Sequence, residues 1–176
     1  MRVTKNSLSW NGFTPGFYVC VGTPGLGPLA IKLGTHSRYD HTFMITSMEG
    51  EIVQAMPGGV EKAHISQYAG RPMKISSGIS MNKAQQDALV QAAYSMVGTP
   101  YNDLGIFDDG LESIGVHWRY LADLASGDHE LICSQAVALM GKAAGYDWMC
   151  GKRDASEVTP ANLAKQKWMY SYQIQQ

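Results

Sequence analysis

Short apolar runs alternate with glycine and proline through the first third of the chain, the pattern of strands joined by turns. Residues 17–21 (Phe-Tyr-Val-Cys-Val) are bounded by Gly and Pro on both sides and predict a strand. Residues 41–46 and 51–56 lie on either side of a short turn at Gly50 and predict an antiparallel hairpin. Glycine and proline also predict a loop at residues 22–28 and a short helix at 28–35 that ends at Gly34. A further strand is predicted at residues 72–75.

In the second half of the chain, apolar residues recur with the period of an α-helix. Between residues 82 and 97 apolar side chains recur at steps of three and four, which predicts an amphipathic helix that Asn82 caps and Gly98 ends. The same pattern predicts helices at 115–125 and 132–144 and, from alternation, a final strand at 168–174. Strands followed by helices predict an α+β fold, an antiparallel sheet packed against helices.

Composition narrows the classes of function. The 176 residues fit one domain, 1–176, and the formal net charge of -1 argues against a nucleic-acid binder. No apolar stretch reaches about 18 residues, so we expect no membrane span. The N-terminal segment lacks the apolar core of a signal peptide, so we expect synthesis in the cytoplasm. Work at the cell wall, or in a virion, would then need a delivery partner.

Cys133 is the candidate nucleophile. It lies at the start of the predicted helix 132–144, where the helix dipole and free backbone amides favour a thiolate. Its own amide would then help to bind an oxyanion. A buried core cysteine is the competing interpretation, because cysteine is among the most buried residue types.

A thiol nucleophile needs a base and a polar group that orients the base. His41 opens an apolar strand, and Gln54 lies inside the partner strand, so the two side chains can share one face of the hairpin. An amide can hold an imidazole by a hydrogen bond. A solvent-facing strand residue is the alternative for Gln54.

Three further residues are candidates for substrate binding, namely His36, Tyr39 and Tyr101. The first two lie just before His41, and Tyr101 follows the end of a helix. His36 and His41 have no carboxylate or cysteine at a familiar ligand spacing, so we expect no metal, and no cofactor motif is present. We expect the other histidines at the surface, namely His64, His117 and His129, and a buried thiol at Cys20.

Several motifs, in their order along the chain, resemble the circularly permuted, YiiX-like branch of the NlpC-type papain-like cysteine hydrolases. The segment from Thr35 to His41 resembles Thr-x-Ser-x-Tyr-Ser-His, and the segment from Ile132 to Val137 resembles Tyr-Cys-Ser-Glu-Leu-Val. Weaker matches are Thr14-Pro15-Gly16-Phe17-Tyr18-Val19, Ile52-Val53-Gln54-Ala55, Gly98-Thr99-Pro100-Tyr101-Asn102 and Val158-Thr159-Pro160-Ala161-Asn162-Leu163. Gln54 replaces the commoner acid of the family, and Gln135 replaces a Glu.

The resemblance implies a papain-like fold and acyl transfer through a thioester, with Cys133 as nucleophile, His41 as base and Gln54 as the orienting residue. It implies an amidase or endopeptidase whose substrate is a peptide or other amide, and the missing signal peptide favours a phage-borne enzyme that cleaves cell-wall peptidoglycan peptides. Two alternatives stay open. One is a lipid-directed thioesterase or acyltransferase with the same triad, and the other is a non-catalytic virion or binding protein on the same scaffold.

Overall fold

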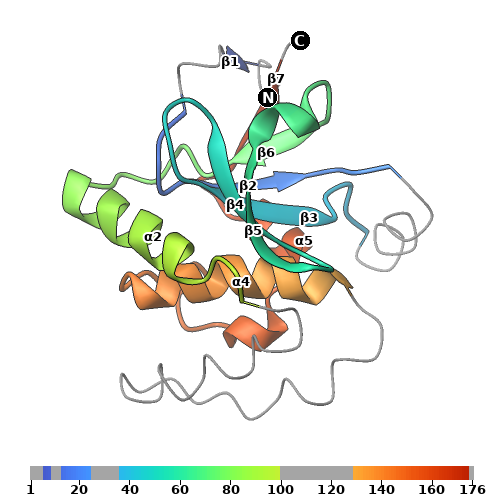
Figure 1. The fold of residues 1–176 in the computed structure, drawn as a ribbon. Helices are drawn as coiled ribbons and strands as arrows, with labels where there is room; N and C mark the ends of the chain where they lie inside the picture. Colours follow the sequence, from blue (N-terminus) through green and yellow to red (C-terminus); the bar gives the residue numbers. More distant parts are fainter. Residues whose placement is uncertain (1–5, 9–12, 25–35, 100–128, 175–176) are drawn as a thin grey trace.

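A computed structural model describes residues 6–8, 13–24, 36–99 and 129–174. In these residues seven strands form one sheet in the order β1-β7-β6-β2-β3-β4-β5. All neighbours are antiparallel except β1 and β7, which run parallel. The sheet and its helices confirm the predicted α+β class (Figure 1). The strands are β1 (Asn6–Leu8), β2 (Tyr18–Val21), β3 (His41–Ile45), β4 (Glu51–Met56), β5 (Gly59–His64), β6 (Met73–Ile75) and β7 (Tyr170–Ile174).

The hairpin of β3 and β4 forms where the alternation predicted it. The turn between them includes Gly50 at φ 99°, a left-handed conformation that glycine adopts without steric cost. In the register of the sheet His41 pairs with Val21 of β2, and Phe43 pairs with Gln54 of β4. His41 and Gln54 are therefore diagonal neighbours on one face.

The elements that were not predicted from sequence include β5 and the 3-10 helix that follows it. The turn at Pro57 and Gly58 reverses the chain into β5, so that Gln54 stands opposite Glu61. A short 3-10 helix, η1 (Ile65–Tyr68), follows. Because β5 is an edge strand with the exposed residues Glu61 and Lys62, its sequence lacks the apolar run that marks an internal strand.

The helices are α2 (Lys83–Ser95), α4 (His129–Ala143) and α5 (Pro160–Ala164), with the short η3 (Ala155–Glu157) between the last two. Asn82 and Gln85 form a capping box at the start of α2, as the sequence signal predicted. Helix α4 packs across β3 and β4 and against α2 and α5 (Figure 1). No helix of the described residues has the length and apolar character that a membrane span requires.

The sheet has apolar residues on both faces. Tyr18, Met44 and Val53 face the helices and share a buried cluster with residues of α4. Phe43, Ile52 and Ile75 belong to a second cluster that η1 helps to cover with Ile65 and Tyr68. Burial on both sides explains why β2, β3 and β4 are nearly continuous apolar runs.

Helix α4 approaches the following segment closely at Gly141. A Cβ there would lie 2.2 Å from Nε1 of Trp148, and that nitrogen donates a hydrogen bond of 3.0 Å to the Val137 carbonyl. A side chain at position 141 would therefore push the indole off the helix.

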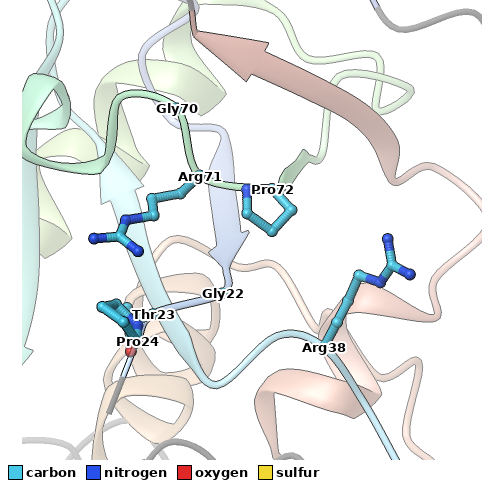
Figure 2. Close-up of a pocket in the computed structure, with 7 residues that line it drawn as sticks. All are labelled: Gly22, Thr23, Pro24, Arg38, Gly70, Arg71 and Pro72. Atoms are coloured by element: carbon cyan, nitrogen blue, oxygen red, sulfur yellow. The ribbon is translucent and has the colours of Figure 1, made fainter.

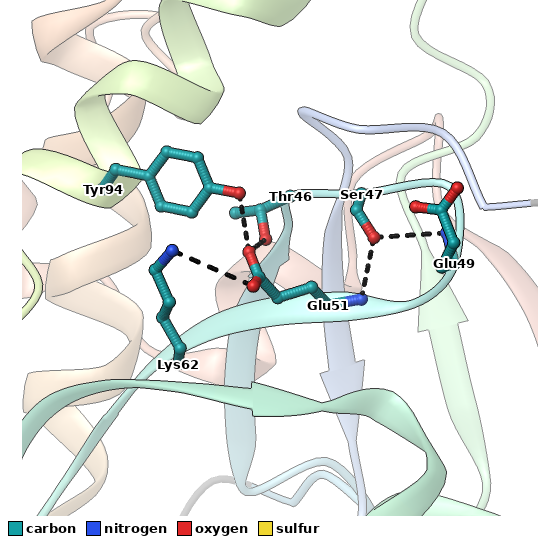
Figure 3. A network of polar contacts seen from close by, with 6 residues as sticks. All are labelled: Thr46, Ser47, Glu49, Glu51, Lys62 and Tyr94. Carbon is teal, nitrogen blue, oxygen red and sulfur yellow. Dashed lines mark hydrogen bonds and ion pairs between the residues drawn. The ribbon is translucent and has the colours of Figure 1, made fainter.

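A polar network joins α2 to the β3–β4 hairpin (Figure 3). The Glu51 carboxylate accepts hydrogen bonds from the hydroxyls of Tyr94 at 2.6 Å and Thr46 at 2.9 Å. Nζ of Lys62 lies 3.9 Å from the other oxygen and also stands over the Tyr94 ring. One carboxylate thus links the helix to Thr46, just beyond β3, and to Lys62 of β5.

Candidate active site

His41 and Gln54 are in direct contact. Nε2 of His41 lies 3.1 Å from Oε1 of Gln54 across the hairpin, so the predicted pairing of these two side chains on one face is present. Gln54 is buried, with 1% of its surface exposed, so the alternative of a solvent-facing glutamine does not hold.

Two residues that were not singled out in the sequence fix the Gln54 amide. Its Nε2 donates to the Glu61 carboxylate at 2.9 Å, and its Oε1 accepts from the Tyr68 hydroxyl at 2.7 Å. With its nitrogen held by a carboxylate, the amide must present its oxygen to His41. Recognition of a two-residue turn at Pro57 and Gly58 would have placed Glu61 opposite Gln54 from the sequence alone.

The contact with Gln54 sets the tautomer of His41. An amide oxygen accepts only, so Nε2 carries the hydrogen and donates it, and Nδ1 is left as the proton acceptor. The ring lies between aromatic neighbours, with its centroid 5.8 Å from that of Tyr68 and 6.1 Å from that of Phe43. Burial lowers the pKa of His41, and the Gln54 hydrogen bond and the Asp40 charge oppose that effect only in part. The structure thus favours a neutral imidazole, the form of a general base.

Cys133 differs from the prediction in its position on the helix. Helix α4 begins at His129, so Cys133 lies in its second turn and not at its start. A residue there directs its N–H to the carbonyl four positions earlier, and the dipole effect weakens beyond the first turn. The expected oxyanion role of the Cys133 amide is therefore wrong for this geometry, because that amide belongs to the helix.

The Cys133 side chain lies in the packed layer between α4 and the sheet. It is 1% exposed and shares a cluster with Cys20, Tyr39 and Met44. A charge on the Cys133 sulfur contributes to the raised pKa of Cys20 and of Tyr68, and burial is the larger cause for both. Cys133 is therefore near residues of both clusters, including the tyrosine that bonds Gln54.

The predicted substrate residues occupy different environments. His36 is exposed, with φ 51°, and Tyr39 is buried with Nζ of Lys74 5.7 Å from its ring centroid. Both line a cavity of about 310 Å³ together with Arg38 and Lys165. Tyr101 lies outside the described residues, as do His117 and the predicted helices at 28–35 and 115–125.

A second cavity, of about 450 Å³, shares Arg38 with the first. Figure 2 shows the residues that line it. It is lined by Gly22, Thr23, Pro24, Arg38, Gly70, Arg71 and Pro72. Asp40 lies close by and accepts hydrogen bonds from the backbone and the hydroxyl of Thr23. Sequence reasoning assigned no role to Arg38 or Arg71.

Cys20 and His64 lie outside the contacts of His41 and Gln54. Cys20 is buried, as expected, and its thiol donates to the Pro160 carbonyl at 3.7 Å. His64 is exposed and caps η1 through Ser66. Within residues 6–8, 13–24, 36–99 and 129–174, no group of three His, Cys, Asp or Glu side chains is arranged to hold a metal ion.

The fold has a counterpart among solved structures. The crystal structure of the metalloprotein YiiX from Escherichia coli O157:H7 aligns with 90% of this chain and 97% of its own, with a TM-score of 0.50 and 19% identity. At that identity the similarity establishes a YiiX-like fold and no more. No protein-family profile and no curated protein sequence matches the chain.

Proposed function

We propose that this protein is a cysteine amidase or endopeptidase with Cys133 as nucleophile, His41 as general base and Gln54 as the residue that orients His41. The observation that carries the proposal is the hydrogen bond of 3.1 Å between His41 and Gln54, whose amide is fixed in turn by Glu61 and Tyr68. A half-buried imidazole held in one tautomer by Gln54, whose amide Glu61 and Tyr68 fix in turn, is more than the sheet needs for packing.

The chemistry follows from the orientation of the imidazole. Nδ1 of His41 takes the proton of the Cys133 thiol, and the sulfur forms a bond to the carbonyl carbon of an amide. Nδ1 then returns its proton to the nitrogen of the leaving amine as the C–N bond breaks. A water molecule attacks the thioester, gives a proton to His41, and releases the acid and the Cys133 thiol. Gln54 holds Nε2 throughout and stabilises the imidazolium between the two transfers.

The steps above use only side chains of this chain. The structural neighbour YiiX is described as a metalloprotein. In the described part of this chain the donor side chains do not converge on a site of three ligands, and His41 is engaged by an amide rather than by a carboxylate. These residues suit an acid–base role better than metal ligation.

Peptidoglycan peptides are the first substrates we propose, because the family resemblance implies this substrate class. A lipid-directed thioesterase with the same three residues is the alternative, and an apolar channel beside Cys133 would favour it.

The burial of Cys133 favours a second candidate, a binding protein that keeps the scaffold without catalysis. With 1% of its surface exposed, the thiol is as buried as its core neighbours Ala136 and Val137. In that case the hydrogen bonds around Gln54 stabilise the sheet only.

Substitution of Gln54 separates the two candidates. Hydrolysis of peptidoglycan fragments and of fluorogenic peptide amides would be measured for the wild type, His41→Ala, Gln54→Leu and the control Gln173→Leu, which alters an exposed strand glutamine. The proposal predicts a loss of about 10²–10⁴-fold for His41→Ala, a smaller loss in kcat for Gln54→Leu, and none for the control. An acyl adduct on Cys133, detected by mass spectrometry, is expected with slow substrates. Hydrolysis that persists in Cys133→Ser would overturn the proposal.

A further inference from the structure

The two cavities described above adjoin at Arg38, and together we call them the arginine groove. Their described lining residues include the cations Arg38, Arg71, Lys74 and Lys165 and no Asp or Glu. The whole chain has a net charge of -1, so this accumulation of positive charge is local and not a property of the composition.

The arginines of the groove are available to a ligand. In the described part of the chain, neither Arg38 nor Arg71 forms an ion pair, whereas Lys83 and Lys142 elsewhere each have a carboxylate partner. Lys74 donates to the Ala164 carbonyl at 2.8 Å. The nearby Asp40 does not line either cavity, and both of its oxygens accept hydrogen bonds from Thr23.

The register of the sheet places the groove next to His41. Val21, the last residue of β2, pairs with His41, and the next residue, Gly22, is part of the groove. Gly22 donates its N–H to the Pro72 carbonyl at 3.1 Å, which brings the β6 side of the groove to the same end of the sheet. A ligand in the groove therefore lies at the end of the sheet at which the imidazole is held.

Figure 2 shows the two guanidinium groups on opposite sides of Pro72, with that of Arg71 above Thr23 and Pro24. Because they are separated, they suit two anionic groups along an extended ligand better than one anion held by both. Each guanidinium offers five N–H donors in a planar fork that matches a carboxylate.

We propose that the arginine groove binds the carboxylates of an acidic peptide, and that Arg38 and Arg71 select such peptides as substrates at the neighbouring site. The inference depends on the proposed function for the peptide nature of the ligand. The test measures peptide binding and not turnover. A failure of this inference is therefore distinguishable from a failure of the proposed hydrolase function.

The test uses the full chain with Cys133→Ser and titration calorimetry at low salt. The probe is the acetylated, amidated tripeptide Glu-Ala-Glu, with Gln-Ala-Gln as its uncharged match. We expect Glu-Ala-Glu to bind, with an affinity that falls as salt is added, and Arg38→Gln and Arg71→Gln each to weaken it by about tenfold or more. Arg153→Gln, a control arginine that is exposed and lines neither cavity, leaves it unchanged.

Three results would overturn the inference. One is the absence of Glu-Ala-Glu binding at millimolar concentration. Another is an affinity for Gln-Ala-Gln equal to that for Glu-Ala-Glu, or a loss of affinity in Arg153→Gln equal to that in the groove variants. The third is tighter binding of inorganic phosphate than of the peptide with the same dependence on both arginines, which would assign the groove to a phosphorylated ligand.

Discussion

At the scale of single residues, the orientation of His41 depends on a chain of hydrogen bonds that begins at a surface carboxylate. Glu61 fixes the Gln54 amide, and the amide oxygen holds Nε2 of His41. Tyr68 supplies a second donor to the same oxygen and packs its ring against Phe43, with centroids 5.0 Å apart. The imidazole is thus held by polar contacts on one side and by aromatic rings on the other.

Two buried threonines on β3 and just beyond it differ in their hydrogen bonding. Oγ1 of Thr42 has no partner among the described residues, whereas Oγ1 of Thr46 donates to Glu51. An unsatisfied buried hydroxyl costs about 1–3 kcal/mol. We therefore expect Thr42→Val to raise the Tm, and the matched Thr46→Val to lower it by about 2–4 °C, as measured by calorimetry. A lower Tm for Thr42→Val would show that its hydroxyl is satisfied.

The sequence predicted the candidate residues His41 and Gln54 because both lie in a hairpin whose turn and alternation are strong local signals. It did not predict Glu61 or Tyr68, since these depend on a turn at Pro57 and Gly58 and on an edge strand with no apolar pattern. The predicted position of Cys133 at the start of its helix was also wrong, because α4 begins at His129 and not at Ile132.

At the scale of elements, β2, β3, β4, β6 and β7 and the helix α2 formed where hydrophobic periodicity predicted them. Except for β7, in which Ile174 alone is buried, each of these elements has a buried face, so burial and sequence pattern agree. The pairing of β1 with β7 joins residues that are more than 160 positions apart, and no local signal encodes such a contact.

The Glu51 network is a polar link between α2 and the sheet, and it gives a pH-dependent prediction. Hydrogen bonds from Tyr94 and Thr46, and the Lys62 charge, lower the pKa of Glu51 below its ordinary value of 4.5, against a smaller opposing effect of burial. The folded state then binds fewer protons than the unfolded state, so the stabilisation is present above pH 4.5 and is lost as the pH falls through the lowered pKa.

We expect Glu51→Gln to lower the Tm by a few degrees at pH 7, because about 1 kcal/mol shifts the Tm of a chain of this size by about 2–4 °C and solvent screens this partly exposed group. The difference in Tm between the wild type and the variant should shrink as the pH falls below 4.5. Glu49→Gln, in the adjacent turn and outside the carboxylate's own contacts, serves as the control. A difference in Tm that does not change with pH would mean that the charge of Glu51 is not what stabilises the hairpin.

At the scale of the whole molecule, the sheet separates two apolar clusters, and the proposed chemistry needs groups from both. His41 and Gln54 lie on the strand face of the cluster that contains Phe43 and Tyr68, whereas Cys133 comes from the helix on the other side. A charge on the Cys133 sulfur would raise the pKa of Tyr68, in one cluster, and of Cys20, in the other. The arginine groove lies at the same end of the sheet as His41, so the proposed binding site and the proposed catalytic site would be adjacent.

The most direct test of the account is the rate at which iodoacetamide alkylates Cys133 between pH 4 and 9. The rate would be followed by peptide mass spectrometry in a Cys150→Ser background, because Cys150 is exposed and Cys20 is buried. If neutral His41 removes the thiol proton, the rate should rise through an apparent pKa at or below 6.5, the ordinary value that burial lowers, and His41→Ala should move it toward about 8.5. A native protein in which Cys133 titrates near 8.5, or does not react until unfolded, with His41→Ala unchanged, would contradict the account.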